Sequence, residues 1–177
     1  MLEQSFAAAE KIFTVLDMVP EVVDEPDAIE LKEIKGEIEF KDVWFAYNPG
    51  EWVLKGVSFH VYPKQTVAFV GATGSGKSTI LNLICRNYDI QKGQILIDGI
   101  DIRHIKIASL RSHFGQMLQD VFLFAGDIRS NIVLRSDNVT DEDVWQACRY
   151  VNSDGFIQKL EGGLDETVRE QGNNFSA

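Results

Sequence analysis

The sequence of 177 residues contains little cysteine and little proline. Its two cysteines, Cys85 and Cys148, are far apart and lack the paired spacing of a metal site. Two isolated cysteines are also too few for a disulfide-rich secreted fold, so we expect reduced thiols that are buried as small apolar side chains. This favours a reducing compartment.

The chain also lacks long hydrophobic runs and an excess of positive charge. No stretch approaches the about 20 apolar residues that a membrane helix needs, and no signal peptide is evident at the start. The 17 Lys and Arg against 27 Asp and Glu give a formal net charge of −10, which argues against nonspecific nucleic-acid binding. The 45% hydrophobic and 25% charged residues are typical of a soluble globular protein.

The most specific motif is GATGSGKST at 71–79, which fits the phosphate-binding pattern G-x-x-x-x-G-K-[S/T]. Backbone N–H groups must point at the phosphates, and side chains at the glycine positions would block that approach. We expect Lys77 to contact the β- and γ-phosphates, Ser78 to bind Mg²⁺, and Thr79 to open a helix whose N-terminal dipole favours the anion. The candidate nucleotide-binding residues of the loop are Gly71, Ala72, Thr73, Gly74, Ser75, Gly76, Lys77, Ser78 and Thr79.

Strand and helix patterns surround this loop. Residues 66–70 (TVAFV) are a short apolar, β-branched run that predicts a buried parallel strand, and residues 78–87 have the apolar spacing of a helix. Alternating residues in 37–47 and 57–61 predict antiparallel strands, with a bulge at Asp42, and residues 94–97 predict a further short strand.

Beyond residue 120 the patterns are helical. Asp127 and Thr140 are candidate N-caps, and Ser153 is a candidate cap for a helix through Leu160 that Gly162 and Gly163 would end. At the other end of the chain, apolar residues at helical spacing in 5–19 predict a helix that stops at Pro20. Residues 1–35 hold nine acidic and three basic residues, so we interpret them as a linker helix and an acidic connector.

The order of these segments resembles the nucleotide-binding domain of ABC transporters, in particular exporters with a fused membrane domain. Residues 43–47 (VWFAY) are similar to the strand that presents an aromatic ring to adenine, so the resemblance implies that Tyr47 stacks on the base. Residues 114–124 resemble the segment with the Q-loop glutamine, which is Gln119 here and would reach Mg²⁺ or the attacking water. Val53 completes the implied nucleotide-binding set.

Other segments carry the resemblance further along the chain. Residues 126–132 (GDIRSNI) resemble the exporter segment after the Q-loop, and residues 166–172 (ETVREQG) resemble the X-loop, which touches the cytoplasmic loops of the membrane domain. Residues 174–177 (NFSA) resemble the opening of the signature motif. We therefore expect the piece to be incomplete at its C-terminus, without the Walker B aspartate, the catalytic glutamate and the switch histidine, and to bind MgATP without turnover.

The resemblance implies an α/β fold: a P-loop NTPase (RecA-like) core with an antiparallel β subdomain and an α-helical subdomain. We expect residues 1–35 to connect to the membrane domain and residues 36–177 to form a partial nucleotide-binding domain, divided into 36–119 and 120–177. The implied cofactors are ATP and Mg²⁺, with Lys77 and Gln119 as catalytic residues and Ser78 and Gln119 as metal ligands. The implied partners are a second nucleotide-binding domain, identical or different, and the membrane domain at the cytoplasmic face of the cell membrane.

Two other classes of function remain open on the sequence. A soluble P-loop kinase or other NTPase would share the phosphate loop, but it would predict an arginine-rich lid and no strand with an adenine-stacking aromatic residue. An ABC ATPase of repair or translation would share the whole pattern and would make the N-terminal helix a start rather than the exit of a membrane helix.

Overall fold

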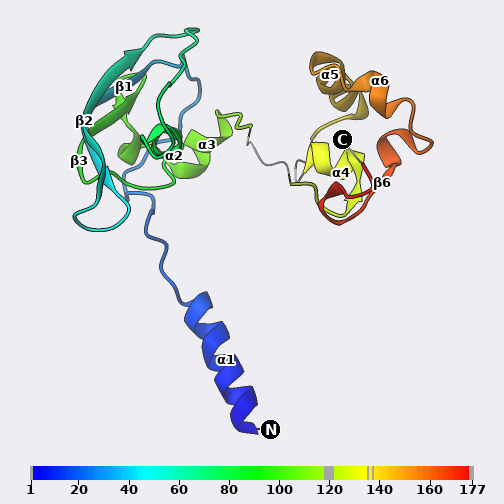
Figure 1. Ribbon diagram of the computed structural model, residues 1–177, viewed down its shortest axis with the longest axis horizontal. Helices are drawn as coiled ribbons and strands as arrows, with labels where there is room; N and C mark the ends of the chain where they lie inside the picture. Colours follow the sequence, from blue (N-terminus) through cyan, green and yellow to red (C-terminus); the bar gives the residue numbers. More distant parts are fainter. Residues whose placement is uncertain (1, 118–121, 135, 137, 176–177) are drawn as a thin grey trace. The chain divides into compact units, whose positions relative to one another are not determined.

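The computed structural model describes residues 2–117, 122–134, 136 and 138–175 (Figure 1). The chain divides into two compact units, Met1–Gln116 (unit 1) and Met117–Ala177 (unit 2), each of which has its own hydrophobic core.

Unit 1 is built on a sheet with the strand order β2-β1-β3-β4. The central strand β1 (Ile38–Ala46) pairs antiparallel with β2 (Trp52–Val61) and with β3 (Lys92–Ile97), and β3 pairs antiparallel with β4 (Ile100–Asp101). The predicted antiparallel strands are therefore confirmed. The predicted bulge is confirmed as well, because the register shifts between Phe40 and Val43 and Asp42 has a positive φ of 46°.

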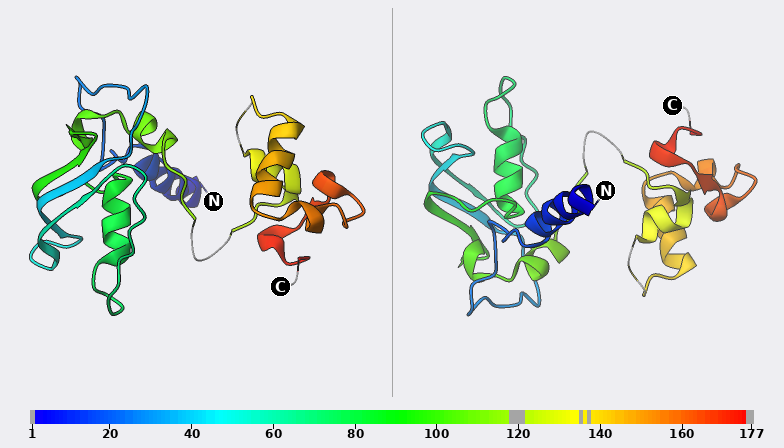
Figure 2. Two further views of the ribbon diagram at one scale, coloured as in Figure 1. Left: turned by 90° about the horizontal axis from the view of Figure 1, so that it is seen from above. Right: turned by 90° about the horizontal axis from the view of Figure 1, so that it is seen from below.

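Helix α2 (Lys77–Ile84) lies along one face of this sheet (Figure 2). Its buried residues Ile80 and Leu83 belong to the same hydrophobic core as the buried side chains of β1, β2 and β3. The helix ends three residues before the predicted Asn87, at the Cys85 cap, and Arg86 has a positive φ of 49°. The 3₁₀ helix η1 (Ile102–His104) and α3 (Ile107–Ser112) follow. The core consists of Phe40, Val43, Phe45, Leu54, Ile80, Leu83, Ile95, Ile97, Ile102, Ile105 and Leu110.

The predicted buried strand at residues 66–70 was wrong for this structure. These residues have no regular secondary structure, and Val70 is 93% exposed. A parallel strand must pair its backbone N–H and C=O groups with neighbouring strands, and no strand among the described residues lies in register beside it. The apolar, β-branched composition alone therefore does not produce a strand at this position.

The N-terminal part of unit 1 consists of helix α1 (Leu2–Leu16) and the acidic connector. Two of the apolar side chains of α1, Phe6 and Leu16, are 72% and 70% exposed. Hydrogen bonds attach the connector to the rest of unit 1. Arg86 donates to the carbonyl of Val23, and the N–H of Ile107 donates to the carboxylate of Asp24. Ile29 forms a parallel bridge with Ile105, and Ser109 bonds to the backbone of Leu31.

Among the described residues, none of the helices combines the length and the apolar composition that crossing a membrane would require. Both cysteines are free thiols, with Cys148 buried as expected and Cys85 only partly buried. Burial raises the pKa of the Cys85 thiol, although the nearby Arg111 acts in the opposite direction.

Unit 2 contains short helices around a two-stranded sheet. Strand β5 (Gly126–Asp127) pairs antiparallel with β6 (Thr167–Val168). Between them lie the helices α4 (Ile128–Val133), α5 (Asp141–Tyr150), α6 (Asp154–Ile157) and η2 (Gly163–Asp165), and η3 (Glu170–Gly172) follows β6. The core consists of Val144, Cys148, Ile157 and Leu164.

The predicted N-caps Asp127 and Thr140 are both confirmed, and each forms a reciprocal capping box, with Ser130 and Asp143 respectively. Ser153 behaves differently from the prediction. Its hydroxyl donates to the carbonyl of Cys148 at 3.3 Å and forms no capping hydrogen bond to α6, and α6 ends at Ile157 rather than at the predicted Leu160.

Candidate nucleotide-binding site

The phosphate loop lies between residues 62–70, which follow β2 and have no helix or strand, and the N-terminus of α2. Gly74 and Gly76 have φ values of 83° and 89°, a left-handed conformation that L side chains rarely adopt. Gly76 is also buried as the N-cap residue of α2, and a Cβ there would lie 2.8 Å from Cδ2 of Leu54. Two of the three glycines are therefore required by backbone conformation, and one of them also by space.

The third glycine and the lysine shape the interior of the loop. The Nζ of Lys77 donates to the carbonyl oxygens of Gly71 and Ala72, each at 2.8 Å. The lysine side chain thus folds back over the loop and holds its positive charge there. A Cβ on Gly71 would lie 2.7 Å from Oγ of Ser75, which itself lies 3.4 Å from the lysine Nζ.

The N-terminus of α2 is open to an anion. Residues 71–75 are exposed, as is Ser78 in the first turn, whereas Thr79 is buried. No acidic side chain lies in the first turn of α2, while the first turn of α5 carries three. Because the first N–H groups of a helix attract negative charge, the positive lysine and the lack of acids make this end of α2 suited to phosphate. Ser78 is exposed, and its hydroxyl is a suitable oxygen ligand for Mg²⁺.

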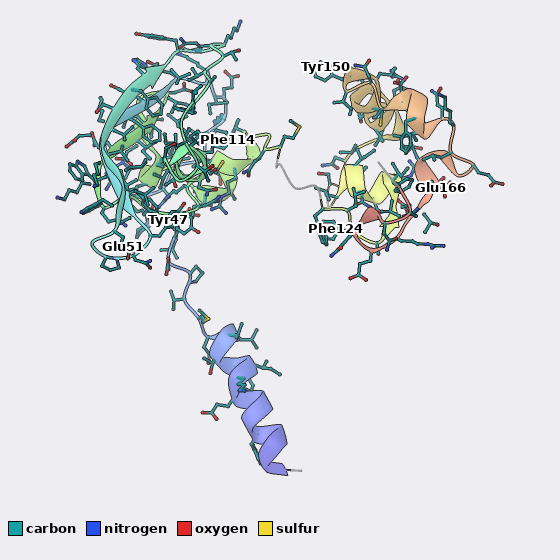
Figure 3. The ribbon with its side chains drawn as sticks, viewed as in Figure 1. Tyr47, Glu51, Phe114, Phe124, Tyr150 and Glu166 are labelled. Atoms are coloured by element: carbon teal, nitrogen blue, oxygen red, sulfur yellow. The ribbon has the colours of Figure 1, made fainter. Side chains whose placement is uncertain are left out.

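Tyr47 lies one residue beyond the end of β1 (Figure 3). Its hydroxyl oxygen is 3.1 Å from Oγ1 of Thr79, so a hydrogen bond connects this strand end to the first turn of α2. The side chain is 47% exposed, which leaves ring surface available for a base. The structure thus brings Tyr47 to Thr79, the last residue of the phosphate-loop motif.

Two further predicted residues complete this description. Val53, on β2, lies against the loop, since its Cγ1 would be 3.5 Å from a Cβ on Gly76. Gln119 lies outside the described residues, and so does its neighbour Asp120.

Sequence reasoning missed the residues that hold Tyr47. The ring of Tyr88 packs nearly perpendicular to that of Tyr47. The side-chain amide of Gln91 accepts a hydrogen bond from the N–H of Ala46 and donates one to the carbonyl of Ala46. These residues belong to a segment after α2 that carries no periodicity. The pairing of β1 with β3 brings the segment beside Tyr47, and no local pattern in the sequence indicates that proximity.

Comparisons with known proteins identify the family of this chain. The family model described as ABC transporter matches residues 54–177. The chain is 44% identical over 176 residues to the uncharacterized ABC transporter ATP-binding protein YknV of Bacillus subtilis (strain 168), covering 99% of this chain and 29% of that protein. It is 38% identical to the ATP-dependent lipid A-core flippase of Syntrophus aciditrophicus (strain SB), with the same coverage of 99% and 29%.

A solved structure of an ABC exporter also matches this chain. The structure of a bacterial Atm1-family ABC exporter with ATP bound matches with a TM-score of 0.90 and 36% identity, covering 99% of this chain and 31% of that chain. The chain therefore spans less than a third of the length of these relatives. The phosphate loop, its lysine and the neighbouring aromatic residue thus lie in a known ABC ATPase fold, and the chain belongs to the ABC transporter family.

Proposed function

We propose that this chain is the ATP-binding part of an ABC exporter in which the binding and hydrolysis of ATP drive transport across a membrane. The observation that carries the proposal is the phosphate loop, where Lys77 and the N-terminus of α2 supply positive charge in an otherwise acidic chain. Tyr47 would stack on the base, and Ser78 would ligate Mg²⁺. Gln119 is the proposed sensor of the γ-phosphate and a second metal ligand.

The relatives favour an exporter over the alternatives. Several of them are proteins with a fused permease, such as the probable multidrug resistance ATP-binding/permease protein YheH, which is 43% identical to this chain. A kinase is not supported by this match. The proposed partners are the cytoplasmic loops of a membrane domain and a second nucleotide-binding domain, at the cytoplasmic face of the membrane. The relatives are named for different cargoes, among them lipid A core and fatty acid. The proposal therefore names no cargo and concerns the ATP-driven step alone.

The test is calorimetric titration of MgATP into the chain and into Lys77→Ala. We expect the substitution to weaken binding by about 10-fold or more, because a hydrogen bond to a charged group contributes about 1.5 to 3 kcal/mol. Chelation of Mg²⁺ with EDTA is expected to weaken binding to the parent chain as well, because the cation screens the triphosphate charge.

The matched control is Lys55→Ala, which removes an exposed lysine of β2 in the same unit. This variant is expected to bind MgATP as the parent does. Undiminished affinity in Lys77→Ala would show that the phosphate loop is not the binding site, and an equal loss in both variants would show a nonspecific effect of charge.

A further inference from the structure

The ring of Tyr47 is in contact with side chains on more than one side. Its hydroxyl oxygen lies 3.1 Å from that of Thr79, in the first turn of α2. Its ring centroid lies 5.1 Å from that of Tyr88 at an interplanar angle of 87°, and 4.8 Å from that of Phe45 at 86°. Perpendicular packing at these distances is a favoured arrangement of aromatic pairs.

The backbone next to Tyr47 is fixed independently of the ring. Oε1 of Gln91 accepts the N–H of Ala46 at 3.0 Å, and Nε2 of the same side chain donates to the carbonyl of Ala46 at 3.1 Å. The N–H of Gln91 also donates to the carbonyl of Trp44. With the strand end held in this way, the main freedom left to Tyr47 is rotation of its side chain, which the contacts with Thr79 and Tyr88 restrict.

Tyr88 is itself placed by an anchored segment. Arg86, which is 1% exposed, donates to the carbonyls of Ile102 and Ile105 and to the carboxylate of Asp89. Tyr88 therefore lies between two residues, Arg86 and Gln91, whose side chains are bonded to other parts of unit 1. Tyr88 is 36% exposed, and its ring also packs against that of Phe45 with 5.7 Å between the centroids.

We propose that Tyr88 is a positioning residue for nucleotide binding: its ring holds Tyr47 in the orientation that stacks on the base. The inference rests on the proposed function, since it requires Tyr47 to contact the base. Without the Tyr88 ring, Tyr47 would populate other rotamers, and binding of the base would have to restore the stacking one. Tyr88 thus contributes to affinity without touching the nucleotide, and its contribution depends on the presence of both the base and Tyr47.

This dependence separates a positioning role from a merely structural one. A residue that only stabilised the fold would affect ligands with and without a base alike. Tyr88→Leu is expected to weaken binding of MgATP by about 2- to 10-fold, the range that aromatic pairs of this geometry provide. Binding of magnesium tripolyphosphate, which has phosphates but no base, is expected to stay the same in this variant. Tyr88→Phe keeps the ring and is expected to bind MgATP as the parent does.

The experiment is a double-mutant cycle by calorimetric titration with both ligands. It uses the parent chain, Tyr47→Ala, Tyr88→Leu and the double variant, with circular dichroism to confirm folding. Tyr47→Ala is expected to weaken MgATP binding, and addition of Tyr88→Leu to it is expected to change nothing further. The matched control is Tyr150→Leu, which removes a tyrosine that is 89% exposed in unit 2. Tyr88→Met replaces Tyr88→Leu if that variant does not fold.

The outcomes separate the inference from the proposed function. Equal MgATP affinity in Tyr47→Ala and the parent overturns the base-stacking assignment and the inference together. A loss in Tyr47→Ala without a loss in Tyr88→Leu overturns the inference alone. It is also overturned if Tyr88→Leu weakens tripolyphosphate as much as MgATP, or if its effect on MgATP persists in the Tyr47→Ala background.

Discussion

At the scale of single residues, Gly76 is the position of the phosphate loop where backbone and surroundings both exclude a side chain. Its φ of 89° is left-handed, and an added Cβ would lie 2.8 Å from the buried side chain of Leu54. Gly50, in the turn between β1 and β2, has the same φ of 89° but open space around the position of a Cβ. Substitution of alanine at Gly50 and at Gly76 therefore separates the free-energy cost of the left-handed backbone from the cost of the contact with Leu54.

We predict that Gly76→Ala lowers the free energy of unfolding of unit 1 by more than Gly50→Ala does. Gly50→Ala should cost about 1 to 2 kcal/mol for the left-handed conformation alone. Gly76→Ala adds the contact with Leu54, and it should also abolish most MgATP binding, because relief of the contact would move the N–H groups of the loop. Urea unfolding and calorimetry on the two variants check this. Equal costs, or normal binding by Gly76→Ala, would contradict the prediction.

Residue types explain which parts of the site could be predicted. A backbone cradle for phosphates requires glycine and lysine at fixed spacing, so residues 71–79 could be identified from the sequence alone. A role for Tyr47 in binding the base is implied only by the family resemblance, since an aromatic residue on an alternating strand usually belongs to the core. Tyr88 and Gln91 could not be predicted, because their contacts with Tyr47 and Ala46 depend on strand pairing over a long stretch of sequence.

At the scale of elements, local signals predicted more than composition did. The caps of α4 and α5 were predicted because a side chain and a backbone N–H three residues later meet by helical geometry alone. The bulge at Asp42 was likewise visible as a break in a period of two. The strand at residues 66–70 failed because strand formation requires a neighbouring strand, which composition cannot specify.

The cap of α4 carries a pH dependence. Hydrogen bonds from the backbone N–H and the side chain of Ser130 hold the pKa of Asp127 below its ordinary value, against a small opposing effect of burial. A depressed folded pKa means that the ionised cap stabilises the folded state above the unfolded pKa of about 3.9. This stabilisation is lost as the pH falls through the folded pKa.

We therefore predict that acidification below about pH 4 reduces protection of the N-terminal turn of α4 in the parent chain. Asp127→Asn retains an acceptor for the N–H of Ser130 and should lose less protection over the same pH interval. Asp127→Ala should lower protection already at pH 7. Hydrogen–deuterium exchange of peptides that contain residues 126–134, corrected for the intrinsic exchange rate, measures this. The same acid response in Asp127→Asn and the parent would rule out the cap as its origin.

At the scale of the whole molecule, the core of each unit is built from that unit's own residues. The core of unit 1 joins the sheet with α2, η1 and α3, whereas the core of unit 2 consists of Val144, Cys148, Ile157 and Leu164. A unit of about 60 residues buries a smaller fraction of its surface than a larger domain does and has a correspondingly small margin of stability. Unit 2 should therefore be sensitive to the loss of a single core side chain.

We predict that Leu164→Ala unfolds unit 2 while unit 1 stays folded. Leu164 is 5% exposed, and truncation of a buried leucine costs about 2 to 5 kcal/mol, which is comparable to the whole stability expected for a unit of this size. Hydrogen–deuterium exchange should show lost protection in α5 and retained protection in β1 and β2. The matched control Leu134→Ala, at a leucine of the same unit that is 64% exposed, should leave α5 protected. Lost protection in β1 and β2 of Leu164→Ala would mean that unit 1 depends on unit 2 for its stability, and protection of α5 equal to that of the control would mean that Leu164 contributes little to the core of unit 2.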